Sequence, residues 1–183
     1  VYLNKIKYER MECSNKEKII YINGLLASIA LLNLAPNSAK EYAFVALNSN
    51  SEDLEQSLRI FLETPKWNFK FVNLNEDWRK IILRESSWAF TEIITQNHGY
   101  PNEIGLEKYA ALSEKYNIKI VQELILSCIE NFLKSTSRFE VYQVEIGPIQ
   151  SNDNSGYFAH GESNFLFKTE EDEMFLLYFR ASD

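Results

Sequence analysis

The periodicity of apolar residues changes at Ser135, and this change limits the possible folds more than any other feature. Beyond it, three short runs rich in aromatic and branched side chains are typical of strands: residues 139–146, 164–169 and 174–180. The acidic residues 170–173 separate the last two runs and indicate a hairpin turn. Before Ser135, apolar residues recur mainly at helical spacing. The sequence therefore predicts an α+β fold, with an N-terminal layer of about six helices followed by a small C-terminal antiparallel sheet.

Three Ser-x-x-Glu sequences mark possible helix starts, at Ser14, Ser38 and Ser49. In this capping box the serine hydroxyl accepts from an early backbone N–H of the helix, and the glutamate accepts from the serine N–H. Each sequence precedes an apolar-periodic segment. The sequence therefore predicts helices that begin near residues 15, 39 and 50.

Residues 19–35 contain no charged side chain. With Lys16 and Lys18 before it, this run resembles the apolar core of a signal peptide. It starts well inside the chain, however, and is shorter than the ~20 residues that a membrane span needs. We therefore expect a buried central helix and no membrane association.

Residues 67–71 alternate with period two and are expected to form a short strand or an extended linker. More helices are predicted beyond them. One begins at Asn73 or Asn75 and ends at His98-Gly99, because glycine readily adopts the left-handed conformation that follows a helix. Another is capped by Asn102. A last helix covers residues 118–134, and its expected inward residues are Val121, Leu124, Ile125, Cys128, Ile129, Phe132 and Leu133.

The net charge of −7 lies entirely in the last quarter of the chain. Residues 139–183 hold nine acidic and two basic side chains, whereas residues 1–138 are balanced. Segregated negative charge attracts cationic partners and repels phosphate, so direct nucleic-acid binding is not expected. We expect one domain over residues 1–183, mainly helical over 1–137 and rich in acidic β-hairpins over 138–183.

The sequence contains no phosphate-binding loop, dinucleotide fingerprint or nucleophile elbow, so no cofactor is expected. Residues 151–162 partly match the spacing of an EF-hand calcium loop, but serine replaces the first aspartate, and we interpret the match as coincidence. Cys13 and Cys128 lie far apart without metal-ligand spacing, which favours reduced thiols in the cytoplasm.

The hairpin of residues 165–169, the acidic turn and residues 175–179 resembles hairpins of small bacterial immunity proteins. Those proteins neutralise cognate toxins, often nucleases, in polymorphic-toxin and contact-dependent inhibition systems. The resemblance implies a cytoplasmic binding module whose acidic surface covers the basic cleft of a toxin domain, burying on the order of 1,600 Å². The expected contact residues are Asp153, Tyr157, Glu162, Glu170, Glu171, Asp172, Glu173 and Tyr178.

Two alternatives stay open. The chain could be a small hydrolase or metal-dependent enzyme in which His160 works with Glu162 or Asp153. It could also be a structural or regulatory subunit that binds through a helical face, with the acidic tail merely exposed. An exposed apolar helical patch of several hundred Å² would favour this last interpretation.

Overall fold

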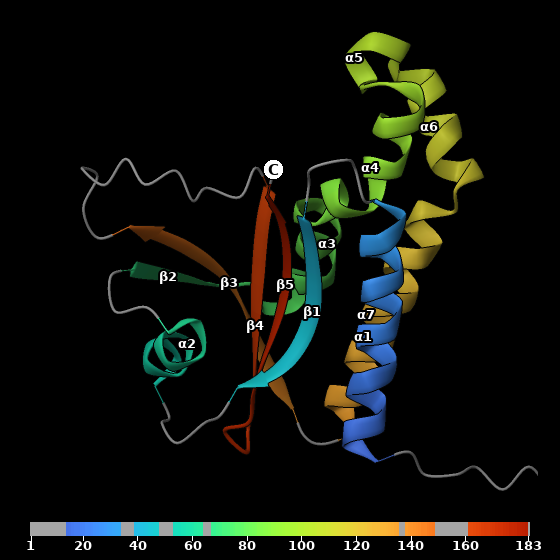
Figure 1. The fold of residues 1–183 in the computed structure, drawn as a ribbon. Helices are drawn as coiled ribbons and strands as arrows, with labels where there is room; N and C mark the ends of the chain where they lie inside the picture. Colours follow the sequence, from blue (N-terminus) through green and yellow to red (C-terminus); the bar gives the residue numbers. More distant parts are fainter. Residues whose placement is uncertain are drawn as a thin grey trace, which may run out of the picture.

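A computed structural model describes residues 14–33, 39–47, 53–63, 67–135, 138–148 and 161–182. Within them, helices and strands alternate along the chain (Figure 1). The elements are α1 (Asn15–Leu32), β1 (Ala39–Leu47), α2 (Leu54–Leu62), β2 (Trp67–Asn73), the short 3-10 helix η1 (Asn75–Asp77), α3 (Trp78–Glu85), α4 (Ser87–His98), α5 (Pro101–Ile104), α6 (Leu106–Lys115), α7 (Ile118–Lys134), β3 (Phe139–Pro148), β4 (Gly161–Thr169) and β5 (Met174–Ser182).

The five strands form one antiparallel sheet in the order β1-β5-β4-β3-β2. The α+β class and the three C-terminal strands are confirmed, but the expectation that all strands follow the helices is wrong. Both edge strands come from the first half of the chain. Because β1 and β2 lie at opposite edges, the segment between them crosses the sheet, and it carries α2 over the face opposite α1 and α7 (Figure 1).

The predicted helix after Ser38 is instead the edge strand β1. Its alanine, lysine and glutamate residues suit a helix, but pairing with β5 outweighs this local preference. Phe44 pairs in register with Leu177, and both are fully buried. Alternate side chains of β1 therefore enter the two cores on the two sides of the sheet, which a helix could not achieve.

Helix α1 begins as predicted. Ser14 Oγ accepts from the Glu17 N–H, and Glu17 Oε2 accepts from the Ser14 N–H at 2.7 Å, which completes the capping box. The Glu17 carboxylate has a lowered pKa because of its hydrogen bonds with Ser14. The box at Ser49 lies outside the described residues. Helix α2 begins at Leu54, where Asp53 accepts from the Glu55 N–H.

Two asparagines of the α1 segment bind backbone groups of other elements. Asn23 donates to the Phe44 carbonyl at 2.8 Å and accepts from the Phe44 N–H at 2.7 Å, so its amide takes the place of a neighbouring strand at the edge of β1. Asn33 donates to the Ala89 carbonyl and accepts from the Ile93 N–H, the two groups that pair across one turn of an uninterrupted helix. These bonds fix α1 against both β1 and α4.

The long helix predicted from Asn73 or Asn75 is broken into η1, α3 and α4. The break falls at Ser86, whose hydroxyl donates to the Ile82 carbonyl at 2.7 Å. The predicted end is confirmed, since α4 stops at His98, but Gly99, with φ 95° and ψ 171°, does not have the left-handed helical conformation that was expected. Gly105, with φ 85°, separates α5 from α6 in the region where one helix capped by Asn102 was expected.

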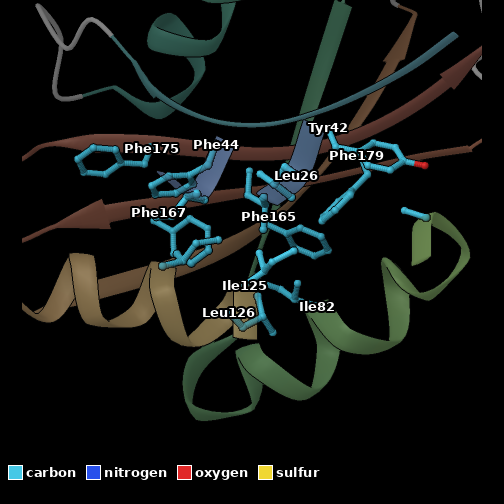
Figure 2. Packing of buried hydrophobic residues seen from close by; sticks show 14 of the residues in the cluster. Leu26, Tyr42, Phe44, Ile82, Ile125, Leu126, Phe165, Phe167, Phe175 and Phe179 are labelled. Carbon is cyan, nitrogen blue, oxygen red and sulfur yellow. The ribbon is translucent and has the colours of Figure 1, made fainter. Parts of the chain in front are cut away.

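The main core lies between the sheet and the helices α1, α3, α4 and α7. Aromatic rings fill its centre, where Phe44 stacks on Phe175 with centroids 5.5 Å apart (Figure 2). Phe132 meets Phe175 edge-on at 5.1 Å. A smaller core on the other face joins the sheet to α2 through Leu58. Helix α7 matches the prediction for residues 118–134, except that Leu124 is 47% exposed instead of inward.

Candidate functional site: the outward face of helix α1

The structure separates the acidic residues that were expected to share one surface. Glu162 lies near the start of β4, where its carboxylate accepts from Arg180 Nε at 3.3 Å and from Asn164 at 2.8 Å. The acidic turn, residues 170–173, joins the far end of β4 to β5. At about 3.3 Å per residue, the seven residues from Glu162 to Thr169 place the two sites ~23 Å apart. The expectation of a single acidic surface that includes Glu162 is therefore wrong.

The acidic turn itself is exposed at all four positions, Glu170, Glu171, Asp172 and Glu173. Asp172 accepts from Lys168 at 3.0 Å and has φ 59°, the left-handed conformation that closes the turn. The Thr169 hydroxyl accepts from the Glu173 N–H at 3.1 Å. These contacts hold the hairpin end in place, and it presents several carboxylates to solvent.

Tyr178 was expected to be a surface anchor, and this expectation is wrong. Its side chain is only 5% exposed and belongs to the core beneath α2. Its hydroxyl donates to Glu41 Oε1 at 2.6 Å. Burial, and then the bond to the Glu41 carboxylate, raise the pKa of Tyr178. Period-two alternation predicts an exposed side only where one face of a strand meets solvent, and β5 is a central strand covered on both faces.

Asp153, Tyr157 and His160 lie outside the described residues, as does most of the EF-hand-like loop. The hydrolase alternative therefore stays a prediction. Among the described residues, no group of three or more His, Cys, Asp or Glu side chains could hold a metal ion. Cys128 is a free thiol, and burial raises its pKa.

Helix α1 has the most unusual surface of the described part. Only Ile22, Leu26 and Ala30 of the helix are buried, so the expectation of a fully buried central helix is wrong. Its opposite side faces outward at the edge of the sheet (Figure 1). Four large apolar side chains are exposed there by more than half: Ile20 (59%), Tyr21 (57%), Leu31 (68%) and Leu32 (59%).

We call these four residues, together with Gly24, Ala27 and Ser28, the α1 face. Positions 20, 24, 27 and 31 follow helical spacing along one line, and positions 21, 24, 28 and 32 follow an adjacent line. Gly24 belongs to both lines and therefore marks the centre of the exposed side. Apart from the adjoining residues and backbone of α1 itself, no atom of the described residues lies within 4 Å of the place where a Cβ would stand at Gly24. The centre of the face therefore carries only small residues and is open, whereas large side chains stand at both ends.

The α1 face carries no charge. Its one polar side chain, Ser28, donates to the Gly24 carbonyl at 2.8 Å, so the hydroxyl already has an acceptor within the helix. At roughly 200 Å² for a fully exposed large side chain, the four large residues expose on the order of 500 Å². This is near the upper end of the largest apolar patch on most monomeric proteins, about 300–600 Å². Patches of this size on monomeric proteins are often functional.

A second surface feature is an open groove of about 1060 Å³ between α3, α6 and the start of α7. Its apolar lining includes Leu83, Ala110 and Ile120. Arg79 stands on its rim and binds Glu123 at 2.6 Å, and it also binds Glu130. Lys80, Arg84 and Lys119 also line the groove, so its rim is charged, whereas the α1 face is uncharged.

The buried pair of Lys40 and Glu92, 2.7 Å apart, joins β1 to α4. Lys40 is only 5% exposed, so its charge depends on this carboxylate. Tyr42, on the same face of β1, has a raised pKa because of burial and then the charge of Glu92. These residues position the edge strand against the helices and do not reach the α1 face.

Sequence reasoning found the run that forms the α1 face but misjudged its burial. A charge-free helix is normally buried on all sides, and the run gave no sign of which side would lack a partner.

No protein-family model matches the chain, and no curated protein matches it. Among solved structures, the chain is similar to citrus MAF1 with 16% sequence identity, 90% of this chain and 96% of that chain covered, and a TM-score of 0.37. A likeness this low carries no argument about fold or function. In the described part of the chain, no helix is both long enough and apolar enough to cross a membrane.

Proposed function

We propose that this protein is a structural or regulatory subunit that acts by binding protein through the α1 face. The observation that carries the proposal is the uncharged, half-exposed side of α1, with Ile20, Tyr21, Leu31 and Leu32 open to solvent. Burying about 500 Å² of apolar surface is worth roughly 10 kcal/mol before the costs of association, which provides a strong driving force for docking.

A rigid helix is well suited to this role. The capping box at Ser14, the Asn23 bonds to β1 and the Asn33 bonds to α4 hold the backbone of α1 at its start, middle and end. A partner therefore meets a surface that is already ordered, which lowers the entropic cost of binding. The partner surface should be apolar and uncharged, because an unpaired charge placed against this face would lose its hydration.

The toxin-neutralising function implied by the hairpin resemblance is the second candidate, and the acidic turn supports it. Its four exposed carboxylates could attract a basic cleft. The separation of Glu162 and the burial of Tyr178 remove two of the residues expected to help. This mechanism then rests on the turn alone among the described residues, so we place it second.

Photo-crosslinking distinguishes the two candidates. Benzoylphenylalanine in place of Tyr21 probes the α1 face, and the same residue in place of Glu171 probes the acidic turn. Tyr100, which is 61% exposed immediately before α5, provides a control position away from α1. In cells that naturally produce the protein, our proposal predicts a discrete protein adduct from position 21 and none from position 100. An adduct from position 171 alone would favour the toxin-binding function and contradict ours.

A further inference from the structure

We propose that the α1 face binds a second copy of this chain, forming a two-fold symmetric dimer in which the two α1 helices run antiparallel. This inference rests on the proposed function, since it names the partner of the same surface. A two-fold interface must be complementary to itself, because the same patch lies on both sides. The pattern of side chains on the α1 face has this property.

The large and small residues of the α1 face are arranged symmetrically about the level of Leu26. Ile20 and Tyr21 lie five or six residues before it, and Leu31 and Leu32 lie five or six residues after it. Between these pairs lie the small residues Gly24, Ala27 and Ser28, which form the centre of the face. At 1.5 Å per residue, the large side chains stand about 8 Å on either side of the centre.

An antiparallel pair of helices that cross at this level matches large to large and small to small. Ile20 meets Leu31 of the second copy, Tyr21 meets Leu32, and Gly24 lies near Ser28. Crossed helices are closest at the crossing point and diverge on either side. Small residues at the centre allow this close approach, and large residues fill the widening space at both ends.

Electrostatics favour the antiparallel arrangement. The chain has a net charge of −7, so two copies repel each other unless they meet through a neutral surface. The α1 face is neutral. A parallel pair would bring together helix ends of equal partial charge. Antiparallel pairing places these ends apart.

The area that the dimer buries indicates the affinity to expect. With its central residues included, each copy contributes on the order of 600 Å², so the dimer buries about 1,200 Å², the lower limit for specific interfaces. We therefore expect a dissociation constant in the micromolar range, within reach of sedimentation at ordinary protein concentrations.

Analytical ultracentrifugation of the purified full chain tests the proposal. The mass should rise from 21.4 kDa at low concentration towards twice that value as concentration increases. Gly24→Leu should abolish the rise, because its side chain has room in the isolated helix but blocks the crossing point. Leu106→Glu, which changes the 77% exposed leucine of α6, is the matched control and should leave the dimer intact. Circular dichroism of each variant verifies the helical content.

A charge exchange tests the antiparallel register. Tyr21→Lys and Leu32→Glu should each weaken self-association at least tenfold, because each places a charge against an apolar residue. A mixture of the two variants should associate again, since one lysine then meets one glutamate. In a parallel dimer these positions lie ~16 Å apart along the axis, and mixing would restore nothing.

Three outcomes would overturn the inference: a monomer at all concentrations up to several hundred micromolar, a dimer unaffected by Gly24→Leu, or a monomer that dimerises only after removal of residues 1–13. The last result would show that the leading segment covers the face. A monomer that still gives an adduct of another mass from position 21 would overturn the dimer and leave the proposed function standing. A monomer without any such adduct would contradict both.

Discussion

At the scale of single residues, Asn23 covers part of an exposed strand edge, which its residue type alone would not predict. Its amide satisfies both the N–H and the carbonyl of Phe44 on the free edge of β1. An exposed strand edge can pair with another chain and aggregate, and one asparagine from α1 blocks this edge at its middle. These two hydrogen bonds connect the helix that carries the α1 face to the edge of the sheet.

We predict that Asn23→Ala lowers the free energy of unfolding by about 1–3 kcal/mol, because it leaves two partly buried backbone groups without partners. Urea denaturation measures the change. Asn97→Ala is the control, since Asn97 bonds only to the Ile93 carbonyl of its own helix and should shift stability by less than about 0.5 kcal/mol. Equal effects from the two variants would show that the Asn23 bonds to β1 contribute little.

The buried tyrosines predict how stability changes at high pH. The pKa values of Tyr42 and Tyr178 are raised, mainly by burial and also by the neighbouring carboxylates Glu92 and Glu41. The folded state therefore favours the neutral hydroxyl. Its contribution to stability is complete below the ordinary tyrosine pKa of about 10 and is lost as the pH rises above that value.

Titration of tyrosinate by ultraviolet absorbance tests this prediction. Tyr42 and Tyr178 should ionise only when the protein unfolds, after the exposed tyrosines have ionised. The double variant Tyr42→Phe and Tyr178→Phe should lack this late step, and Tyr100→Phe, at an exposed position, should retain it. A late step that survives the double variant would assign it to other tyrosines.

At the scale of helices and strands, the sequence predicted those elements whose local signals agree with their surroundings. Helix α1 has its capping box, α7 has its apolar stripe, and the hairpin of β4 and β5 has its acidic turn. Strand β1 was missed because its composition suits a helix and its pairing partners in β5 lie 127–143 residues further along the chain. Contacts over such separations leave no local pattern to read.

The exposure of the α1 face was not predicted from the sequence, for a related reason. Apolar spacing identifies which residues can be buried, but the number of buried sides depends on how many elements surround a helix. Helix α1 packs on β1, α4 and α7, and within the described part of the chain no element lies over Gly24. The same limit explains Leu124, which fits the apolar stripe of α7 and is exposed nonetheless.

Substitutions at Gly24 distinguish the contribution of this position to folding stability from its contribution to binding. In the isolated chain, Gly24→Ala should raise the free energy of unfolding by about 0.5–1 kcal/mol, because alanine suits an exposed helix position better than glycine. Ala27→Gly, on the same face, should lower it by a similar amount. Thermal unfolding of dilute protein measures both. Destabilisation by Gly24→Ala would show that the site is not open in solution.

At the scale of the whole molecule, charge and apolar surface are divided between different regions. The acidic turn extends from one end of the β4–β5 hairpin, and α1 lies along the edge of the sheet beside β1 (Figure 1). The sequence correctly indicated an acidic C-terminal quarter. It could not show that Glu162 and the turn lie at opposite ends of one strand, since that separation depends on strand pairing.

Hydroxyl-radical footprinting tests the central claim, that the α1 face is a contact surface, most directly. Labelling of Tyr21, Leu31 and Leu32 is compared between producing cells and dilute purified protein, with Leu106 as the exposed reference. We predict several-fold protection of the α1 residues in cells and unchanged labelling of Leu106. Equal labelling of the α1 residues in both conditions would contradict the claim, because it would mean that the face stays open to water where the protein works.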